Sequence, residues 1–315
     1  MHYFACDVAK DSITAALYSR ALTARQRFTI DNNIPAITEI LRNMKDRGRK
    51  LTVGVESTAL YHAPLVEACT ALDITCLLLN PLLTKEVLRH SIRKRKTDRD
   101  DTLVIAKLLA QGEGHPVTTE SVKDTHKALV RSARKVSMLT QSLALHVRHT
   151  ERVLGEVPPP LLEQCGHIRH TKAQMQKLAI AQADPELRKL LESIPGIGAW
   201  LATVILAETQ NFSRLRSGDA LVAAAGLDPR VKQSGVSLDS HGKLTKRGSP
   251  HLRWALGCAA NVAIRRDPEF RSYYEKKRAE GKRFRTALCA TSRKMAYRVF
   301  AVAKRRTPYL PASVT

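Results

Sequence analysis

Residues 2–30, HYFACDVAKDSITAALYSRALTARQRFTI, contain three short runs rich in apolar and β-branched residues, joined by short polar segments. Runs of this kind, separated by tight turns, predict three successive strands in a meander. Two more strands are predicted from LTVGVES, residues 51–57, and from the continuously apolar ITCLLLN, residues 74–80, which is typical of a strand buried on both faces. Apolar residues at helical spacing in 34–48 and 59–72 predict helices between these strands.

A meander followed by alternating helices and strands predicts a mixed, helix-covered sheet, and the ribonuclease-H-like fold has this order. Folds of this kind place the fourth strand next to the first. Residues 1–112 are predicted to form this α/β domain, which ends with a helix from about Asp98 to Gln111. Residues 113–184 have heptad-like apolar positions that predict a helical, coiled-coil segment, interrupted by the prolines at 158–160. An ordinary helical linker is the alternative. Residues 185–315 are predicted to be a mainly α-helical domain.

The charge of the chain predicts a polyanionic partner. It carries 52 Lys and Arg against 29 Asp and Glu, a formal charge of +23. Nucleic acid is the usual partner for so large an excess. No apolar run approaches the ~20 residues that span a bilayer, so no membrane partner is expected. The six cysteines are scattered without a C-x-x-C pair, which favours reduced thiols and a cytoplasmic protein.

Four acids stand where predicted strands end or where a helix begins: Asp7, Glu56, Asp98 and Asp101. Asp98 and Asp101 are three residues apart and therefore share one helix face, whereas Asp100 is expected to point away from them. Carboxylate oxygens suit Mg²⁺, and a two-metal site can clamp both the attacking and the leaving oxygen of a phosphodiester. The set therefore predicts a magnesium site, with manganese as a substitute. For each acid taken singly, the alternative is a surface residue or a helix cap.

A loop over residues 225–250, AGLDPRVKQSGVSLDSHGKLTKRGSP, is too long for a mere connection, and loops of that length are usually functional. A serine is a poor nucleophile unless a base, a metal or cations stabilise its alkoxide. Ser234 precedes a glycine among lysines and is a candidate nucleophile, with Ser237, Ser240 and Ser249 as competitors. Cations expected to contact nucleic acid lie in or beside this loop and ahead of the helix at Asp98: Arg93, Lys94, Arg95, Lys96, Lys232, Lys243, Lys246, Arg247 and Arg253.

Two further features favour nucleic-acid binding. Residues 193–208, SIPGIGAWLATVILAE, look like a helix-hairpin-helix, whose glycines let backbone N–H groups approach a phosphate. A plain glycine-capped turn is the alternative. Residues 265–306 hold fifteen Lys or Arg against four acids, too few to neutralise the cations. The aromatic residues interleaved there have helical spacing and are predicted to be core rather than base-stacking platforms: Tyr273, Tyr274, Phe284, Tyr297 and Phe300.

Taken together, these motifs resemble the insertion sequence 110 family of transposases, the DEDD transposases. The stretches that carry the resemblance are CDVAKDSI (6–13), VGVESTALYH (53–62), NPLLTKEVLRHSIRKRKTDRDDTLVIAKLL (80–109), LLESIPGIGAWLATVILAE (190–208), AAAGLDPRVKQSG (223–235) and GKLTKRGSPHLRWAL (242–256). The most specific is the third, with its Asn-Pro followed by Lys-Thr-Asp, two residues and Asp. Thr102 stands where the family usually has alanine, and Ser249 where asparagine is common.

The resemblance implies an N-terminal domain like the Holliday-junction resolvase RuvC, with an acidic tetrad of Asp7, Glu56, Asp98 and Asp101. It also implies a coiled coil and a C-terminal domain whose nucleophilic serine falls on Ser234. Family members recombine DNA with a structured non-coding guide RNA, the bridge RNA, and assemble as dimers to tetramers with active sites shared between protomers. The expected setting is the nucleoid of a bacterial or archaeal cell. The alternatives are a RuvC-like metal-dependent junction nuclease without a serine nucleophile and a non-catalytic nucleic-acid-binding protein.

Overall fold

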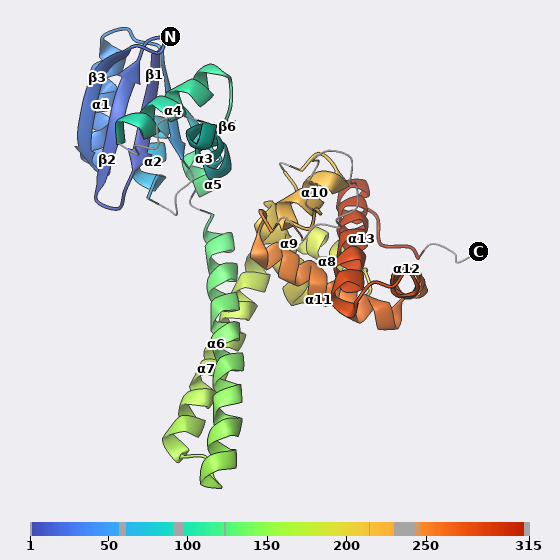
Figure 1. The fold of residues 1–315 in the computed structure, drawn as a ribbon. Coiled ribbons are helices and arrows are strands. Elements are labelled where there is room, and N and C mark those ends of the chain that lie inside the picture. Colours follow the sequence, from blue (N-terminus) through green and yellow to red (C-terminus); the bar gives the residue numbers. More distant parts are fainter. Residues whose placement is uncertain are drawn as a thin grey trace. The chain divides into compact units, whose positions relative to one another are not determined.

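The structure is a computed structural model. It describes residues 2–56, 61–90, 98–122, 124–213, 215–229, 244 and 246–311. The chain divides into two compact units, Met1–Asp124 and Thr125–Thr315 (Figure 1). The finer division into 1–112, 113–184 and 185–315 stays a prediction. In the described part of the chain, no helix is both long enough and apolar enough to cross a membrane.

Unit 1 is built on one mixed sheet. The strands that the structure describes are β1 (His2–Val8), β2 (Ser12–Tyr18), β3 (Ala24–Asp31), β4 (Leu51–Glu56), β5 (Thr75–Leu79) and β6 (His115–Pro116). They lie in the order β3-β2-β1-β4-β5-β6, with β4 parallel to β1 and β5 and the other neighbours antiparallel. The predicted meander and the parallel strands beside it are confirmed, in the strand order of the ribonuclease-H-like fold.

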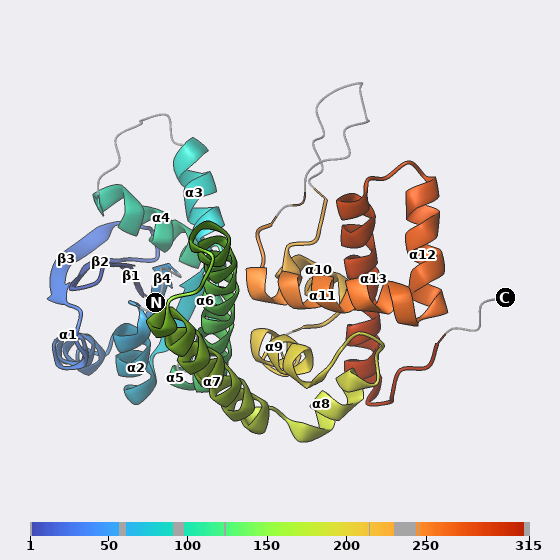
Figure 2. The same ribbon diagram turned by 90° about the horizontal axis from the view of Figure 1, so that it is seen from below.

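Helices cover both faces of this sheet (Figure 2). One face carries α1 (Ile34–Asp46), α2 (Ala63–Ala71) and α5 (Thr119–Val122), and the other carries α3 (Pro81–His90) and α4 (Asp98–Ala110). Because side chains alternate along a strand, Phe4, Cys6 and Val8 of β1 pack with α1 and α2. Tyr3 and Ala5 belong to the opposite core, which α4 completes.

The start of α1 illustrates how the sequence sets these helices. The Asn33 side chain accepts a hydrogen bond from the Ala36 N–H at 3.0 Å, which satisfies a backbone donor at the helix start. Pro35 occupies the first turn, where its missing N–H costs nothing. Ile37 and Leu41, four residues apart, are both fully buried, so this face of the helix lies on the sheet.

Unit 2 begins with two long helices, α6 (Thr125–Leu154) and α7 (Pro159–Gln182), which lie side by side (Figure 1). The break at the predicted prolines is confirmed, since Pro158 precedes the first turn of α7. The further helices described in this unit are α8 (Pro185–Glu192), α9 (Ala199–Thr209), α10 (Gly218–Ala225), α11 (Pro250–Arg266), α12 (Pro268–Ala279) and α13 (Phe284–Arg305). They enclose one large core that includes fully buried Leu206, Leu256 and Val299. The mainly helical C-terminal region is therefore confirmed, and the coiled coil stays a prediction.

Candidate active site

Asp7 and Glu56 lie at the ends of neighbouring parallel strands, Glu56 as the last residue of β4 and Asp7 as the last but one of β1. The register of β1 and β4 pairs Cys6 with Val55. The next residue on each strand is an acid, so Asp7 and Glu56 stand side by side at this edge of the sheet. Neighbouring strands lie about 4.8 Å apart, which places the two carboxylates near each other. The pairing of the first and fourth strands, predicted from the sequence, is confirmed.

Both acids belong to the face of the sheet that α4 covers. Asp7 comes two residues after Ala5, which is in the core formed with α4, and residues two apart on a strand share a face. Glu56 comes two residues after Gly54. A Cβ atom at Gly54 would lie 2.5 Å from Cδ1 of Leu109 in α4, so a side chain at position 54 would force Leu109 to shift from this close contact between helix and strand.

The first turns of α4 carry the other two predicted acids. α4 begins at Asp98, whose side chain lies outside the described atoms. Oδ1 of Asp101 is buried. The fully buried Thr102 lies beside it, with its hydroxyl oxygen 3.1 Å from the hydroxyl of Tyr18 on β2. This hydrogen bond ties the start of α4 to the sheet and gives a structural reason for a threonine at position 102.

Glu56 is held by a residue that the sequence reasoning missed. Thr84 of α3 is buried, and its hydroxyl lies 3.0 Å from Oε2 of Glu56 and 3.0 Å from the carbonyl oxygen of Pro81. A hydroxyl has one proton, so Thr84 donates to one of these oxygens at a time. When it donates to Glu56, it orients the carboxylate, as residues behind metal ligands do. The position of Thr84 within the family-like stretch 80–109 was the only signal for it.

The donor set suits a hard divalent cation, because carboxylate oxygens are the ligands that Mg²⁺ prefers. Among the described residues, no three His, Cys, Asp or Glu side chains lie close enough together to hold a metal ion. The side chain of Asp98 is not among those that the structure describes. The structure thus brings Asp7 and Glu56 together and places Asp101 on the helix that covers their face. The tetrad as a metal site stays a prediction.

The loop predicted to carry the nucleophile has its two ends fixed together. Pro229 pairs with Leu244 in an isolated β-bridge. The Ser249 N–H donates to the carbonyl oxygen of Ala224 at 2.6 Å. A Cβ atom at Gly248 would lie 2.2 Å from that same oxygen, so the two backbone segments can approach this closely only with glycine. The chain therefore enters and leaves the loop at one fixed place in unit 2.

Several predicted site residues fall outside the described part of the chain: Ser234, Lys232, Lys243, Arg93, Lys94, Arg95 and Lys96. The competing serines Ser237 and Ser240 lie outside it as well. Lys246 and Arg247, by contrast, are exposed where the loop ends and can reach a phosphate. Arg253 is half-buried and donates from Nη1 to the carbonyl oxygen of Ala225 at 2.8 Å, so it also supports the backbone at the base of the loop.

Ser249, the remaining competitor, is part of a helix cap. Its Oγ accepts a hydrogen bond from the Leu252 N–H at 3.2 Å and donates to Oε2 of Glu208 at 2.8 Å. The side chain of Glu208 is fully buried and also receives two hydrogen bonds from Arg131 of α6, at 2.7 and 2.9 Å. Burial alone would raise the pKa of Glu208, but the bonds from Arg131 and Ser249 lower it below the ordinary value. This ionised carboxylate joins α6, α9 and the start of α11 where the long loop ends.

Of the predicted helix-hairpin-helix at 193–208, the structure shows a tight turn after α8, which ends at Glu192, and then α9. Ile194 and Ile197 of the turn are buried. Gly196 has φ +93°, and a Cβ atom there would lie 2.3 Å from the carbonyl oxygen of Ala259 in α11. Gly198 has open space around it and precedes the first turn of α9. The turn is therefore docked on α11 through Gly196, and phosphate binding beside it stays a prediction.

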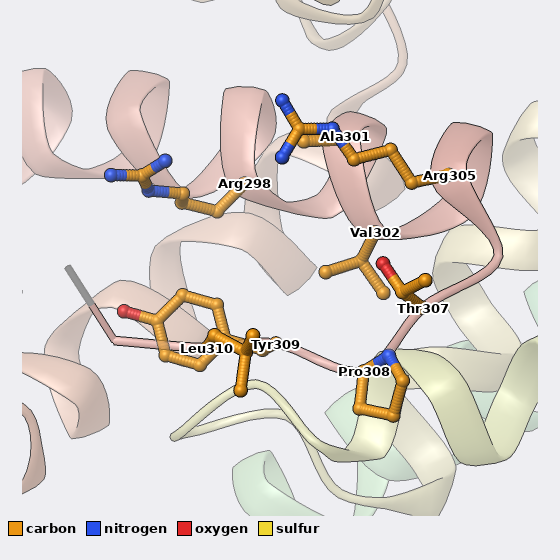
Figure 3. Close-up of a pocket in the computed structure, with 8 residues that line it drawn as sticks. All are labelled: Arg298, Ala301, Val302, Arg305, Thr307, Pro308, Tyr309 and Leu310. Atoms are coloured by element: carbon orange, nitrogen blue, oxygen red, sulfur yellow. The ribbon is translucent and has the colours of Figure 1, made fainter.

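The segment after α13 packs back on the bundle and leaves a small pocket (Figure 3). The pocket is lined by Arg298, Ala301, Val302, Arg305, Thr307, Pro308, Tyr309 and Leu310. The buried hydroxyl of Tyr309 lies 3.1 Å from Oδ2 of Asp267 and 2.9 Å from Oε2 of Glu269. Arg298 donates to Oε1 of Glu269 through both Nε and Nη2. Arg298 is thus paired with Glu269, and the hydrogen bonds of Tyr309 anchor the segment to the start of α12.

Replacing Glu269 with Gln is expected to lower the free energy of unfolding of unit 2 by about 3 kcal/mol at pH 7. Burial would raise the pKa of Glu269, but hydrogen bonds from Arg298, Lys294 and Tyr309 lower it from 4.5 to about 2. The stabilisation that ionised Glu269 contributes is therefore complete above the ordinary glutamate pKa of 4.5, and it is lost as the pH falls through about 2. Urea unfolding followed by tryptophan fluorescence measures it, since both tryptophans of the chain lie in unit 2.

Glu280→Gln is the matched control. Hydrogen bonds from Lys277 and Lys282 lower the pKa of Glu280 to about 2 as well, but this carboxylate is exposed to water, where ion pairs stabilise little. Little change in the unfolding midpoint is expected. Equal effects of the two substitutions, or a Glu269→Gln effect that does not shrink between pH 5 and pH 2, would contradict this assignment.

Comparison with known families gives two matches, in the order expected from the sequence motifs. A family model described as "Transposase" matches residues 4–159, which include the four acids. A second, described as "Transposase IS116/IS110/IS902 family", matches residues 188–275, which include the docked turn, the long loop and α11.

Relatives with similar sequences come from bacterial insertion elements and from a gene-inverting protein. The chain is 32% identical over 152 residues to an IS110 protein of Streptomyces coelicolor, covering 47% of this chain and 37% of that one. It is 27% identical over 225 residues to an IS900 protein of Mycobacterium paratuberculosis, covering 71% and 49%. It is 24% identical over 322 residues to the pilin gene-inverting protein of Moraxella bovis, covering 98% and 97%. The chain thus spans about half the length of the IS900 protein and a little over a third of the IS110 protein. It spans nearly the whole length of the inverting protein.

Among solved structures, RuvC of T. thermophilus in complex with a Holliday junction substrate is similar to 37% of this chain, over 99% of its own length, with 16% identity and a TM-score of 0.29. A second Thermus thermophilus RuvC structure has 13% identity and a TM-score of 0.30. The two family models, which match successive parts of the chain, and the insertion-element relatives show the family. This chain belongs to the IS110 family of transposases.

Proposed function

We propose that the protein is a DNA recombinase that cuts and rejoins strands to move an insertion element. The observation that carries the proposal is the pair of carboxylates, Asp7 and Glu56, at adjacent strand ends on the face that α4 covers. Together with the two acids in the first turns of α4, they offer the oxygen ligands that metal-assisted phosphodiester chemistry requires. Membership in a transposase family supports DNA as the substrate.

The four acids of the tetrad would hold magnesium, or manganese in its place. When bound, the metal would stabilise the negative charge that develops on the scissile phosphate and on the leaving oxygen. The chain itself has to keep the acids ionised and correctly placed. Thr84 orients Glu56 for this purpose, and the bond between Tyr18 and Thr102 seats the helix that carries the other two acids.

Ser234 would be the nucleophile. Its Oγ would attack phosphorus and form an Oγ–P bond while the bond from phosphorus to one deoxyribose oxygen breaks. The serine proton passes to a base or to solvent, and the leaving sugar oxygen becomes a hydroxyl. One phosphoester bond is formed for each one broken, so attack by another sugar hydroxyl can reverse the step and join a new strand. The β-bridge between Pro229 and Leu244 holds the two ends of the loop together, which supports a functional role for the loop.

The full-length similarity to the pilin gene-inverting protein favours recombination over simple cleavage. Inverting a gene requires that strands be cut at two places and rejoined in the opposite orientation. A junction nuclease that uses water as its nucleophile releases its ends and cannot carry out the second half. A covalent serine intermediate retains the ends and their bond energy.

Sequence choice would fall to base pairing with a structured non-coding guide RNA, with the protein contacting mainly backbones. A formal charge of +23 suits a protein that binds both donor and target DNA as well as RNA. We further propose that the protein acts as a dimer to tetramer on the nucleoid, in the cytoplasm of a bacterium or archaeon.

A reconstituted reaction tests the proposal. The purified chain is mixed with Mg²⁺, DNA that carries the element junction, a target DNA, and RNA transcribed from the non-coding segment beside the reading frame. Joined donor–target product is expected only when protein, RNA and metal are all present. Cleaved DNA without joined product would indicate a nuclease, and equal product without RNA would rule out guidance.

A further inference from the structure

Phe284, the first residue of α13, departs from the prediction that the aromatic residues of this region are core. Its side chain is 54% exposed. The ring meets Tyr274 of α12 edge to face, with ring centroids 6.4 Å apart and planes at 75°. Such a pair restrains the ring's orientation and leaves one face of it available. Phe284 is therefore an apolar surface that is held in place rather than a loose side chain.

The ring lies in a strongly basic patch, which we call the turn patch and define as residues 274–285. It contains six Lys or Arg and two acids. Lys277 and Lys282 pair with Glu280, at 2.7 and 2.6 Å. The other four cations of the patch have no ion pair with a carboxylate in the described part of the chain: Lys276, Arg278, Arg283 and Arg285. Arg278, Arg283 and Arg285 are exposed.

A neighbouring aromatic residue provides an internal comparison. The ring of Tyr273 has Lys277 at 5.4 Å and Lys294 at 4.9 Å from its centroid. Its π-system is thus already used by cations of the protein itself. Phe284 has no such cation among the contacts of the described residues. In the turn patch, the cations without a carboxylate partner and the ring without a cation over it are therefore separate groups, available to different parts of one ligand.

We infer that the turn patch binds unpaired nucleotides, with a base stacked on Phe284 and the flanking phosphates on Arg283 and Arg285. A duplex hides its base faces, so it could use the cations but not the ring. A single strand offers both, and base–aromatic stacking adds to the phosphate contacts. A second copy of this chain would bring a formal charge of +23 to an already basic patch, and this repulsion disfavours it as the occupant. The inference rests on the proposed function and extends it, because it specifies that the nucleic acid bound at the turn patch is single-stranded.

Binding of short oligonucleotides to the full-length chain tests this inference. Fluorescence anisotropy is measured in EDTA with fluorescein-labelled oligo(dT), oligo(rU) and a mixed-sequence duplex, each roughly 20 nucleotides or base pairs long, to cover several stacking sites. Phe284→Ala is expected to weaken single-strand binding about tenfold and to leave duplex binding within about twofold. The DNA and RNA arms show which of the two single strands the patch prefers.

Three further variants isolate the cause. Phe284→Trp keeps an aromatic face and should keep single-strand affinity, whereas Phe284→Leu keeps apolar bulk without the face and should behave like Phe284→Ala. Arg283→Ala should weaken single strands and duplex alike and lower the salt slope by about one for the duplex. Unchanged urea unfolding, followed by tryptophan fluorescence, shows that each variant is folded.

Full affinity of Phe284→Leu for single strands, or equal losses on single strands and duplex, would overturn the inference. The assay needs neither metal nor strand cleavage. The binding result can therefore be interpreted even if the catalytic proposal fails, for example if variants that lack the tetrad acids still cleave DNA normally. Conversely, loss of the Phe284 effect would leave the proposed chemistry untouched.

Discussion

Replacing Asp7 with Asn is expected to reduce metal-dependent strand cleavage by about a thousandfold while DNA and RNA binding stay within about twofold. Asn has the same shape as Asp but no charge, so it is a much poorer ligand for a divalent cation. The loss of charge falls next to Glu56, with which Asp7 shares the end of the parallel strand pair. Cleavage of labelled donor DNA over a range of Mg²⁺ concentrations measures the effect.

Asp11→Asn is the matched control, because Asp11 is an exposed acid in the turn just after β1. Its carboxylate belongs to neither a strand end nor the face under α4. Cleavage by this variant should equal that of the unchanged protein. If Asp7→Asn cleaves normally, or if both substitutions reduce cleavage equally, the acids are not ligands at this place.

Ser234→Ala is the second substitution with a large expected effect. It should abolish the covalent protein–DNA adduct and strand exchange, while nucleic-acid binding stays intact. The reason is that alanine has no oxygen to form the bond to phosphorus, and water cannot conserve the phosphoester for rejoining. The adduct is detected as a labelled protein band on a denaturing gel after the reaction is stopped.

Two serine controls sharpen this test. Ser237→Ala removes a competing hydroxyl from the same loop and should leave the adduct unchanged. Ser249→Ala should instead lower the free energy of unfolding by about 1–2 kcal/mol, because Ser249 caps α11 and bonds the buried Glu208. An adduct that persists in Ser234→Ala and disappears in Ser237→Ala would move the nucleophile to the other residue.

Much of the site's framework could be predicted from the sequence because strand patterns and acids at strand ends are local signals. The run of strands, the pairing of the first strand with the fourth, and the helix opening at Asp98 all follow from order and spacing, and the structure bears them out. The resemblance to a family then assigned the tetrad. None of these steps required knowledge of side-chain contacts.

What the sequence could not provide depends on tertiary contacts. Thr84 is an ordinary threonine in a helix until the fold places it 3.0 Å from Glu56. Ser249 was one of three serines that competed with Ser234 as the candidate nucleophile, until the fold set it against Glu208, 41 residues earlier in the chain. Phe284 was predicted to be core from its helical spacing. The prediction is wrong because helical spacing does not say which face of the helix is covered. The structure shows that face open to solvent.

A metal-bound structure tests the proposed site most directly. Crystals grown with Mn²⁺, with diffraction measured at the manganese absorption edge, locate the ion from its anomalous signal. The expected result is an ion about 2.0–2.5 Å from oxygens of Asp7 and Glu56 and from at least one oxygen of Asp98 or Asp101. Manganese bound elsewhere, with Asp7 and Glu56 facing away from each other, would contradict the proposal.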